Sequence, residues 1–289
     1  RHGLNAKKAR KKQNEKYAKV KQRFQKRLDR RQVDIEVPDL TNVYVLEVPE
    51  EYDIESIVAH YNNDPHVEYA APDYVMRPTL VPNDPRFLDN SLPGITRINA
   101  DHAWDSTSGS GIVIAVVDSG VDYNHQDLSA NIWSNPGEIS GNNIDDDGNG
   151  YIDDIRGWDF TECEFSIFGI CLQEKDPDNN PLDGDGHGTH VAGTAAAVGQ
   201  NAVGVIGVAY GAKIMPVKGL DDGGSGASSW LAQGIEYAAE NGADVINNSW
   251  GCGDPCPSDP TVEDAVRAAH ALGAVVVFAA GNSNDDVTQ

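Results

Sequence analysis

The second half of the chain alternates short apolar runs with helix-forming segments, and this alternation constrains the fold more than any other feature. The run Gly111–Val117 is apolar along most of its length, which predicts a strand buried on both faces of a sheet. Alternation of strands and helices favours an α/β fold, with a mostly parallel, doubly wound sheet and helices on both faces. The further expected strands and helices are Lys213–Val217, Ala243–Asn248, Ala274–Ala280, His187–Ala197, Ser228–Glu240 and Asp259–Leu272.

A smaller α+β lobe is expected ahead of this sheet. Its segments follow the order strand, helix, strand, strand: Asn42–Val48, Asp53–Tyr61, Val67–Ala71 and Tyr74–Arg77. Asp53 is expected to cap the helix. Proline then recurs at positions 78, 82 and 85, which indicates an extended linker. The predicted parts are a basic head at 1–35 (helical or disordered), the lobe with its linker at 36–82, and the α/β domain at 83–289.

Charge is divided unevenly along the chain. Residues 1–31 contain 14 of the 22 basic residues, whereas the other 258 residues carry a net charge of −35. An acidic body does not bind nucleic acid by attraction to phosphates, but it suits calcium sites and an extracellular environment. In the basic part, the apolar residues Tyr17, Val20, Phe24 and Leu28 recur at helical spacing. A basic amphipathic helix and a solvated tail both fit that pattern.

The cysteines and the chain's start indicate the compartment. The four cysteines form two local pairs, Cys163 with Cys171 and Cys252 with Cys256, which predicts two short disulfides in an oxidising compartment; four reduced thiols are the alternative. The chain begins at Arg1 and has no run of about eighteen apolar residues, so no membrane span is expected. We interpret it as a trimmed or fragmentary sequence of a secreted protein.

Polar residues follow several of the predicted strands. Asp118, Asn248 and Asn282 stand at strand ends, and His187 opens a helix after a glycine-rich loop. In open α/β sheets, ligands bind beyond the carboxyl ends of the strands. A partly hydrated carboxylate at Asp118 could orient an imidazole, and His187 has the ordinary pKa of a general base near neutrality. Taken alone, Asp118 is better explained as a helix cap or loop contact, and His187 as a surface hydrogen-bonding residue.

Four motifs, taken together, resemble the signatures of the subtilisin-like serine peptidases, or subtilases. They are Val116-Val117-Asp118-Ser119-Gly120-Val121-Asp122, His187-Gly188-Thr189-His190-Val191-Ala192-Gly193-Thr194, Asn248-Ser249-Trp250-Gly251 and Ala279-Ala280-Gly281-Asn282, in the family's order. The resemblance implies a subtilisin-like α/β domain. It also implies that Asp118 orients the imidazole, that His187 is the general base and that Asn282 donates its amide to the oxyanion.

The same resemblance implies a substrate cleft. Two edge segments would clasp an extended peptide as an added strand, and a third would form a pocket wall. These nine residues are Gly224, Ser225, Gly226, Ser249, Trp250, Gly251, Ala279, Ala280 and Gly281. His190 lies one helical turn after His187, and we expect it to be a packed supporting histidine rather than a metal ligand.

The family's nucleophile is missing from this sequence. The family carries it in a Gly-Thr-Ser motif that opens a later helix, and no such motif occurs here; Ser283 has a different setting. We therefore expect the chain alone to be inactive and interpret it as C-terminally truncated. The lobe resembles the family's inhibitory propeptide, especially at Val67–Pro72, which implies a processing site within Arg77–Asp84.

Two structural calcium sites are expected. Asp145-Asp146-Asp147-Gly148-Asn149-Gly150-Tyr151 fits the first half of an EF-hand-type loop, with Asp145, Asp147, Asn149 and the Tyr151 carbonyl as ligands. Arg156 occupies the position of the usual closing glutamate, so Asp153 or Asp154 is expected to close the site. The resemblance implies a second site made of Asp127, Asn201, Asp84 and the carbonyls of Gly199, Val203 and Val205.

The leading hypothesis is a secreted serine endopeptidase zymogen. Its partners would be protein or peptide substrates and its own propeptide, with no nucleic acid and no redox or nucleotide cofactor. A metal hydrolase is one alternative, built from Asp118, Asp122, His125, His187 and His190. A calcium-stabilised, peptide-binding pseudoprotease is the other.

Overall fold

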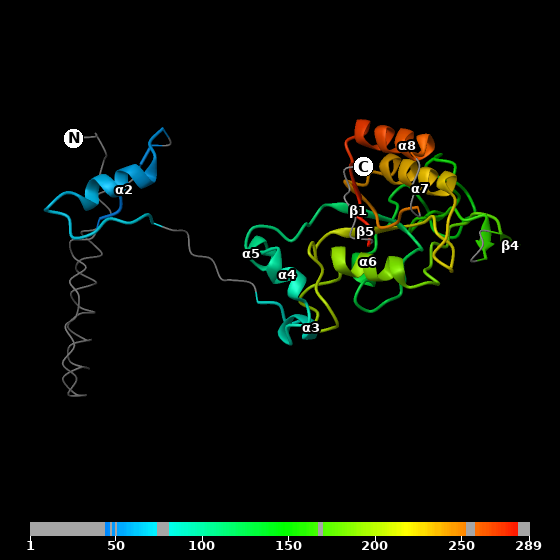
Figure 1. Ribbon diagram of the computed structural model, residues 1–289, viewed down its shortest axis with the longest axis horizontal. Helices are drawn as coiled ribbons and strands as arrows, with labels where there is room; N and C mark the ends of the chain where they lie inside the picture. The colour runs from blue at the N-terminus through cyan, green and yellow to red at the C-terminus, as the bar shows by residue number, and fades with distance from the viewer. Residues whose placement is uncertain are drawn as a thin grey trace. The chain divides into compact units, whose positions relative to one another are not determined.

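The computed structural model describes residues 44–46, 48–49, 51–73, 81–166, 170–252 and 258–282. The chain divides into two compact units, Arg1–Arg77 and Pro78–Gln289 (Figure 1). Within the described ranges, no helix is long and apolar enough to span a membrane.

In the first unit, the predicted helix forms but one predicted strand does not. Helix α2 spans Ile54–Asn62, and the Asp53 carboxylate accepts a hydrogen bond from the Ser56 amide at 2.9 Å, as expected for its N-cap. Val67–Ala71 was wrongly predicted as a strand. There the Asn62 side chain satisfies both backbone groups of Ala70, at 2.6 and 3.1 Å, in place of a neighbouring strand. The predicted strand Tyr74–Arg77 lies outside the described residues, as does part of Asn42–Val48.

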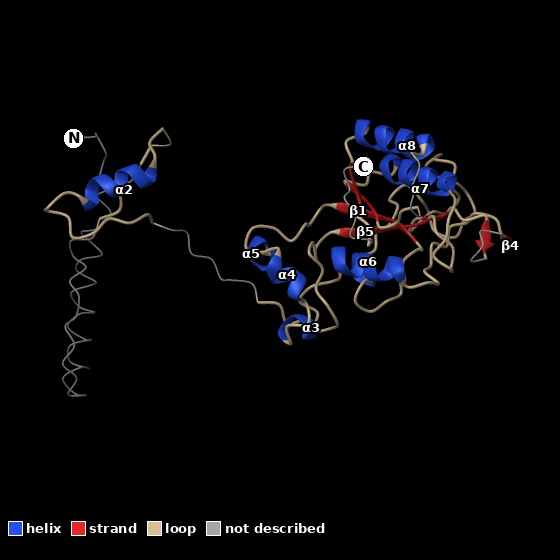
Figure 2. Cartoon of the chain, in the orientation of Figure 1, coloured by secondary structure: helices blue, strands red, loops and turns tan. Residues whose placement is uncertain are grey.

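The second unit is built on a five-stranded parallel sheet (Figure 2). Its strand order is β2-β5-β1-β6-β7, with β1 in the centre. The strands are β1 Val113–Asp118, β2 Trp158–Asp159, β5 Lys213–Lys218, β6 Val245–Asn248 and β7 Val275–Phe278. Because β1 is paired on both sides and covered on both faces, five of its six residues are buried.

Helices cover both faces of this sheet, so the predicted doubly wound α/β class is confirmed. Helix α6, His187–Ala196, packs on β1 and β5 from one face, whereas α7, Ser228–Glu240, and α8, Pro260–Ala271, pack from the other (Figure 2). The alternating side chains of β1 divide accordingly, because Val116 joins the core beneath α6 and Val117 joins the core beneath α7.

The helix ends follow the capping residues of the sequence. Pro260 occupies the first turn of α8, and the Asp259 side chain accepts from the amides of Thr261 and Val262. Gly242 and Gly273 follow the ends of α7 and α8 with φ of 82° and 100°, conformations that a side chain would strain. The boundaries of these helices therefore agree with the predicted ones to within one residue.

Four short helical segments in this unit were not predicted. They are α3 Pro85–Leu88, α4 Pro93–Arg97, α5 Ala100–Ala103 and the 3₁₀ turn η2 Ser129–Asn131. The expectation that Pro85 belongs to an extended linker is wrong, because it begins α3, where proline's fixed φ suits a first helical turn. Segments of three to five residues contain too few periodic positions to be recognised by pattern.

A disulfide-closed hairpin projects from the second unit. Strand β3, Cys163–Phe165, pairs antiparallel with β4, Cys171–Glu174. Cys163 and Cys171 are bonded to each other with their Cα atoms 5.7 Å apart, which confirms the first predicted pair. The second pair includes Cys256, which lies outside the described residues.

Candidate active site

Asp118 is the last residue of the central strand. Its side chain is fully buried, and the neighbouring Ser119 amide donates to its Oδ1 atom at 2.8 Å. The carboxylate is thus fixed at the carboxyl end of the sheet, where ligand sites of open α/β folds form.

His187 is the first residue of α6. It follows Gly186, whose φ of 103° turns the chain sharply into the helix. Gly188 passes close to β1, because a Cβ placed there would lie 2.0 Å from the carbonyl oxygen of Gly120. A glycine on each side of His187 therefore allows the helix start to approach the end of β1.

Asp118 and His187 are in direct contact. The Nδ1 atom of His187 lies 2.7 Å from Oδ1 of Asp118, although 69 positions separate them in the chain. The histidine side chain is about half exposed, at 49%, whereas the carboxylate is fully buried. Because a carboxylate accepts, this contact places the histidine proton on Nδ1 and leaves Nε2 free to accept a proton.

The contact shifts the protonation of both partners. Its hydrogen bond with Asp118 raises the pKa of His187 above the ordinary value, against a smaller opposing effect of burial. Burial raises the pKa of Asp118, and the hydrogen bonds from His187 and the Ser119 amide oppose this rise without cancelling it. An aspartate–histidine pair of this kind can orient an imidazole and stabilise its protonated form.

Asp183 connects the two elements that carry the pair, and the sequence reasoning missed it. Its Oδ1 accepts from the Ser119 hydroxyl at 2.9 Å and the Gly186 amide at 2.8 Å. Its Oδ2 accepts from the Thr189 amide and hydroxyl. Burial acts to raise the pKa of Asp183, but these hydrogen bonds together outweigh it and lower the pKa. No local pattern marks this aspartate, because it lies three residues before Gly186, the N-cap of α6.

Comparison with known proteins places this arrangement in a family. The family described as Subtilase family matches residues 109–289. The chain belongs to the subtilase family. Residues 11–73 match a second family, the Fervidolysin N-terminal prodomain, which confirms the resemblance of the N-terminal lobe to a propeptide.

Individual relatives agree with this assignment. A thermophilic serine proteinase from Bacillus sp. (strain AK1) is 39% identical over 236 residues, which cover 81% of this chain and 49% of the relative. An extracellular protease of Xanthomonas campestris pv. campestris is 36% identical over 250 residues, and the match covers 81% of this chain and 40% of the relative. A solved protease of Pseudoalteromonas arctica superposes with a TM-score of 0.55 at 34% identity, and the match covers 72% of this chain and 61% of the solved chain. The chain thus spans about half the length of these curated relatives.

The predicted cleft segments of this subtilase lie at the same edge of the sheet as Asp118. Ala279 follows β7 and donates to the carbonyl of Asn248, the last residue of β6, at 3.0 Å. The Trp250 indole donates to the Val117 carbonyl at 3.0 Å, so this side chain anchors its segment to β1. Asn282 is exposed at the end of the described chain. Among the hydrogen bonds and ion pairs of the described residues, none joins Asn282 to the Asp118–His187 pair.

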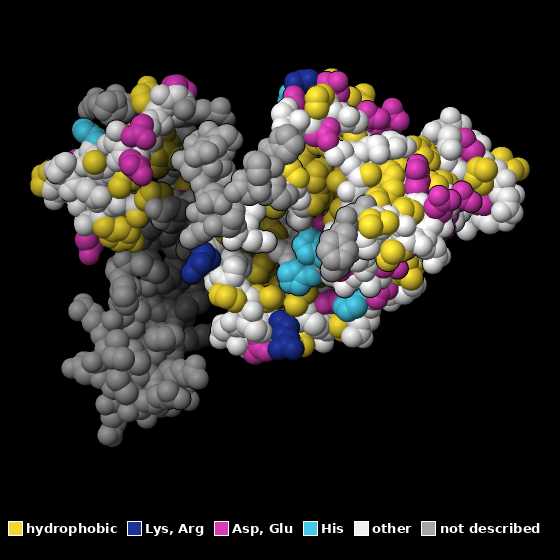
Figure 3. Space-filling view, turned by 45° about the vertical axis from the view of Figure 1, so that its right-hand side comes forward, with side chains coloured by type: hydrophobic (Ala, Val, Ile, Leu, Met, Phe, Trp, Pro, Cys, Tyr) yellow, Lys and Arg dark blue, Asp and Glu magenta, His cyan; other side chains and the backbone are white. Residues whose placement is uncertain are grey.

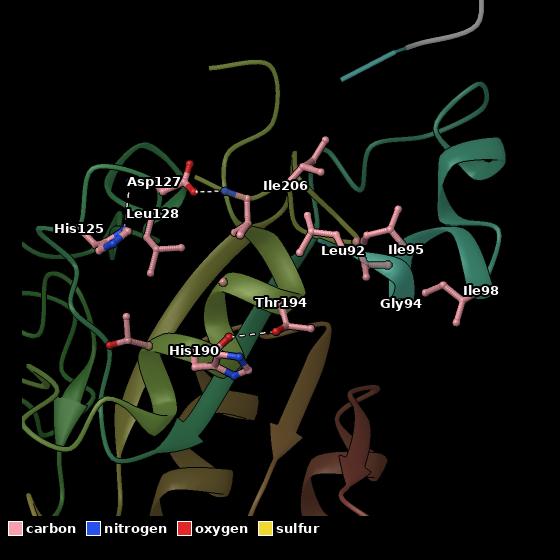
Figure 4. Close-up of a pocket in the computed structure, with 14 residues that line it drawn as sticks. Leu92, Gly94, Ile95, Ile98, His125, Asp127, Leu128, His190, Thr194 and Ile206 are labelled. Atoms are coloured by element: carbon pink, nitrogen blue, oxygen red, sulfur yellow. Dashed lines mark hydrogen bonds between the residues drawn. The ribbon is translucent and has the colours of Figure 1, made fainter. Parts of the chain in front are cut away.

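His190 does not have the predicted setting. It is exposed rather than packed, and with Thr194 it faces a mainly apolar pocket of about 450 Å³ between α6 and α4 (Figure 4). The His125 ring lines the same pocket, and its Nδ1 accepts from the Asp127 amide. Histidine side chains are also visible at the surface in the space-filling view, where acidic side chains are spread widely (Figure 3).

The residues of the metal-hydrolase alternative are not gathered into a metal site. Among the described residues, only Glu138, Asp145 and Asp147 form a group of three or more potential ligands with their atoms within 4.8 Å of one another. Glu138 was missed because it lies outside the EF-hand-type spacing. Its Oε1 accepts from the amides of Asp146 and Asp147, so the fold of the loop brings it to the cluster.

The predicted closing residues of the acidic loop, residues 138–154, have other partners. Asp153 accepts from the amides of Gly141, Asn142 and Asn143 with its two oxygens. Asp154 is buried and accepts from Asn135, Asn149 and the Tyr237 hydroxyl. Both carboxylates therefore organise the loop, and neither belongs to the Glu138 cluster.

The second predicted calcium region contains two buried carboxylates. Asp127 accepts from the Asn201 side chain at 2.7 Å and the Val205 amide at 2.8 Å. Asp84 is fully buried and accepts from the Gln200 amide, but its Oδ1 atom has no hydrogen-bond partner among the described residues. A buried, unpartnered carboxylate oxygen is costly, and a bound cation would satisfy it.

Proposed function

We propose that this subtilase chain carries the propeptide and the Asp–His part of a secreted serine endopeptidase that hydrolyses peptide bonds in proteins. The observation that carries the proposal is the 2.7 Å contact between buried Asp118 and half-exposed His187 at the carboxyl edge of a parallel sheet. That contact leaves His187 Nε2 available to remove a proton from a serine hydroxyl.

The remaining roles follow from the family. Asn282 would donate its amide to the developing oxyanion, an interaction worth about 3 kcal/mol in subtilisins. An extended peptide would lie between segments 224–226 and 249–251, with residues 279–281 as a pocket wall. The nucleophile would come from polypeptide outside this chain, since no Gly-Thr-Ser motif occurs in it. Residues 1–289 alone would then be inactive.

The propeptide and secretion belong to the same proposal. The prodomain match at residues 11–73 supports an intramolecular inhibitor and folding aid. The Cys163–Cys171 disulfide and the extracellular name of one relative support a secreted enzyme. Cleavage within Arg77–Asp84 would release the mature domain, and N-terminal sequencing of the secreted protein tests this directly.

Calcium is proposed as a structural ion at two places. Asp84, Asp127 and Asn201 would hold one ion with the carbonyls of Gly199, Val203 and Val205, and the unpartnered Asp84 oxygen supports this set. The second ion would bind Glu138, Asp145 and Asp147 together with Asn149 and the Tyr151 carbonyl. Bound calcium at about a thousand times its Kd would add roughly 4 kcal/mol of stability. A melting temperature unchanged by a chelator would contradict both sites.

The hydrolytic proposal is tested with the product of the complete reading frame. The wild type should digest casein and react with a fluorophosphonate probe, and His187→Ala should do neither. His270→Ala, which changes an exposed histidine on α8, is the matched control and should retain both reactions. A complete product that binds peptides without either reaction would support the pseudoprotease alternative instead.

A further inference from the structure

The disulfide-closed hairpin β3–β4 is joined to the proposed substrate segment by one buried carboxylate. Asp221, which is fully buried, lies three residues before Gly224. Its Oδ2 atom accepts a hydrogen bond from the Phe165 amide of β3 at 2.6 Å. Its Oδ1 atom accepts from the amides of Gly223 and Ser225 at 3.0 and 2.8 Å. One side chain thus binds the hairpin with one oxygen and the segment with the other.

The segment depends on this carboxylate for its conformation. The Asp221 amide donates to the Ser225 carbonyl at 2.7 Å, so residues 221–225 form a closed turn around the side chain. Gly224 has a φ of 73°, and a Cβ on Gly226 would lie 2.2 Å from the Gly219 carbonyl oxygen. The turn is therefore pressed against the chain that leaves β5 and has little freedom to adjust.

Further contacts hold the hairpin in place beside residues 224–226. The Phe165 ring stacks on Trp230 of α7 with centroids 5.2 Å apart and planes 21° apart. The Asp222 amide donates to the Glu164 carboxylate at 3.3 Å. Lys175 forms ion pairs with Glu164 at 3.4 Å and Asp159 at 3.0 Å, which links the hairpin's base to β2. The disulfide joins Cys163, the buried first residue of β3, to Cys171, the first residue of β4.

We propose that Asp221 and the hairpin β3–β4 act as a brace that holds residues 224–226 in the shape needed to pair with an extended substrate. This inference rests on the proposed peptide-binding role of that segment. Asp221 is a positioning residue, since it is buried and its side chain accepts from backbone amides alone within the described part of the chain. The brace should strengthen binding of peptides long enough to reach the segment and leave short substrates unaffected.

Asp221→Asn tests the brace with one exchanged atom. The amide oxygen can still accept from Gly223 and Ser225, whereas the NH₂ group would face the Phe165 N–H and lose that hydrogen bond. In the product of the complete reading frame, the Kd for a labelled eight-residue peptide should rise about tenfold. KM for a long peptide should rise similarly, with kcat/KM for a short ester unchanged. Asp176→Asn, the same exchange at an exposed aspartate outside the hairpin strands, is the matched control.

A second variant keeps the proposal testable if Asp221→Asn fails to fold. The double variant Cys163→Ala/Cys171→Ala removes the disulfide but keeps Asp221. It should also raise the Kd for the eight-residue peptide, by a smaller factor than Asp221→Asn does. Unchanged long-peptide binding in both variants would overturn the brace, as would equal losses for long and short substrates. Failure of the wild type to hydrolyse either substrate would contradict the endopeptidase proposal. The comparison of peptide Kd values between wild type and variants would still test the brace in that case.

Discussion

The Asp118–His187 pair and the acidic loop at residues 138–154 both gather charged side chains, but different parts of the fold position them. The pair stands at the end of strand β1 and the start of helix α6, so backbone hydrogen bonding sets both positions. The acidic loop has no helix or strand between Trp133 and Trp158, and its carboxylates accept from its own amides. The strand and helix therefore orient the side chains of the pair, whereas in the loop the carboxylates themselves determine the backbone conformation through their hydrogen bonds.

The difference predicts that a change at the pair affects chemistry and leaves folding largely intact. In the product of the complete reading frame, Asp118→Asn should lower kcat by about 10⁴-fold, because the imidazole loses its fixed tautomer and its stabilising charge. Circular dichroism should show a native spectrum. A fall in kcat smaller than tenfold would contradict the role proposed for Asp118.

A change within the loop should instead affect stability. Asp154→Ala removes the acceptor of the Tyr237 hydroxyl, which lies 2.6 Å away in a buried position. Burial and the neighbouring carboxylate raise the pKa of Tyr237, so its hydroxyl stays protonated and needs an acceptor. The free energy of unfolding in urea should fall by about 3 kcal/mol. Glu236→Gln, an exposed change on the same helix, should stay within about 0.5 kcal/mol of the wild type.

Calcium sharpens the comparison, because the loop should respond to it and the Asp118–His187 pair should not. Asp145→Asn removes one charge from the Glu138 cluster and should weaken calcium binding about tenfold, observed by calorimetry as one weaker site. Asp176→Asn, an exposed change outside the loop, is the control. Identical titrations of wild type and Asp145→Asn would remove the loop from the proposed calcium sites.

The smallest expected effect is a shift in the titration of His187. Its folded pKa is raised mainly by the hydrogen bond to Asp118, so the protonated ring stabilises the fold below the unfolded pKa of about 6.5. That contribution is lost as the pH rises through the folded pKa. The proposed hydrolysis requires the neutral ring, so the rate should fall as the pH drops through the same raised value. NMR of the ring should show a lower pKa in Asp118→Asn; an unchanged pKa would contradict the stated cause.

The sequence predicted the residues of the Asp118–His187 pair more completely than those of the acidic loop. The apolar run before Asp118 and the glycines around His187 specify a strand end and a helix start, and parallel pairing brings such ends to one edge. The loop was predicted only as far as the EF-hand-type spacing extends. Glu138 lies outside that spacing, and Asp153 and Asp154 took backbone and side-chain partners that no local pattern reveals.

The sequence by itself determined the α/β class and the main helices and strands, because periodicity and capping are local properties. The contacting aspartate and histidine were identified through the family resemblance of the motifs that contain them. Tertiary structure alone decided that Asp183 joins Ser119 to α6, that Asn62 replaces a strand beside Ala70, and that Asp221 links the hairpin to residues 224–226. These contacts bring together side chains and backbone groups that only the folded chain makes neighbours, so no spacing in the sequence records them.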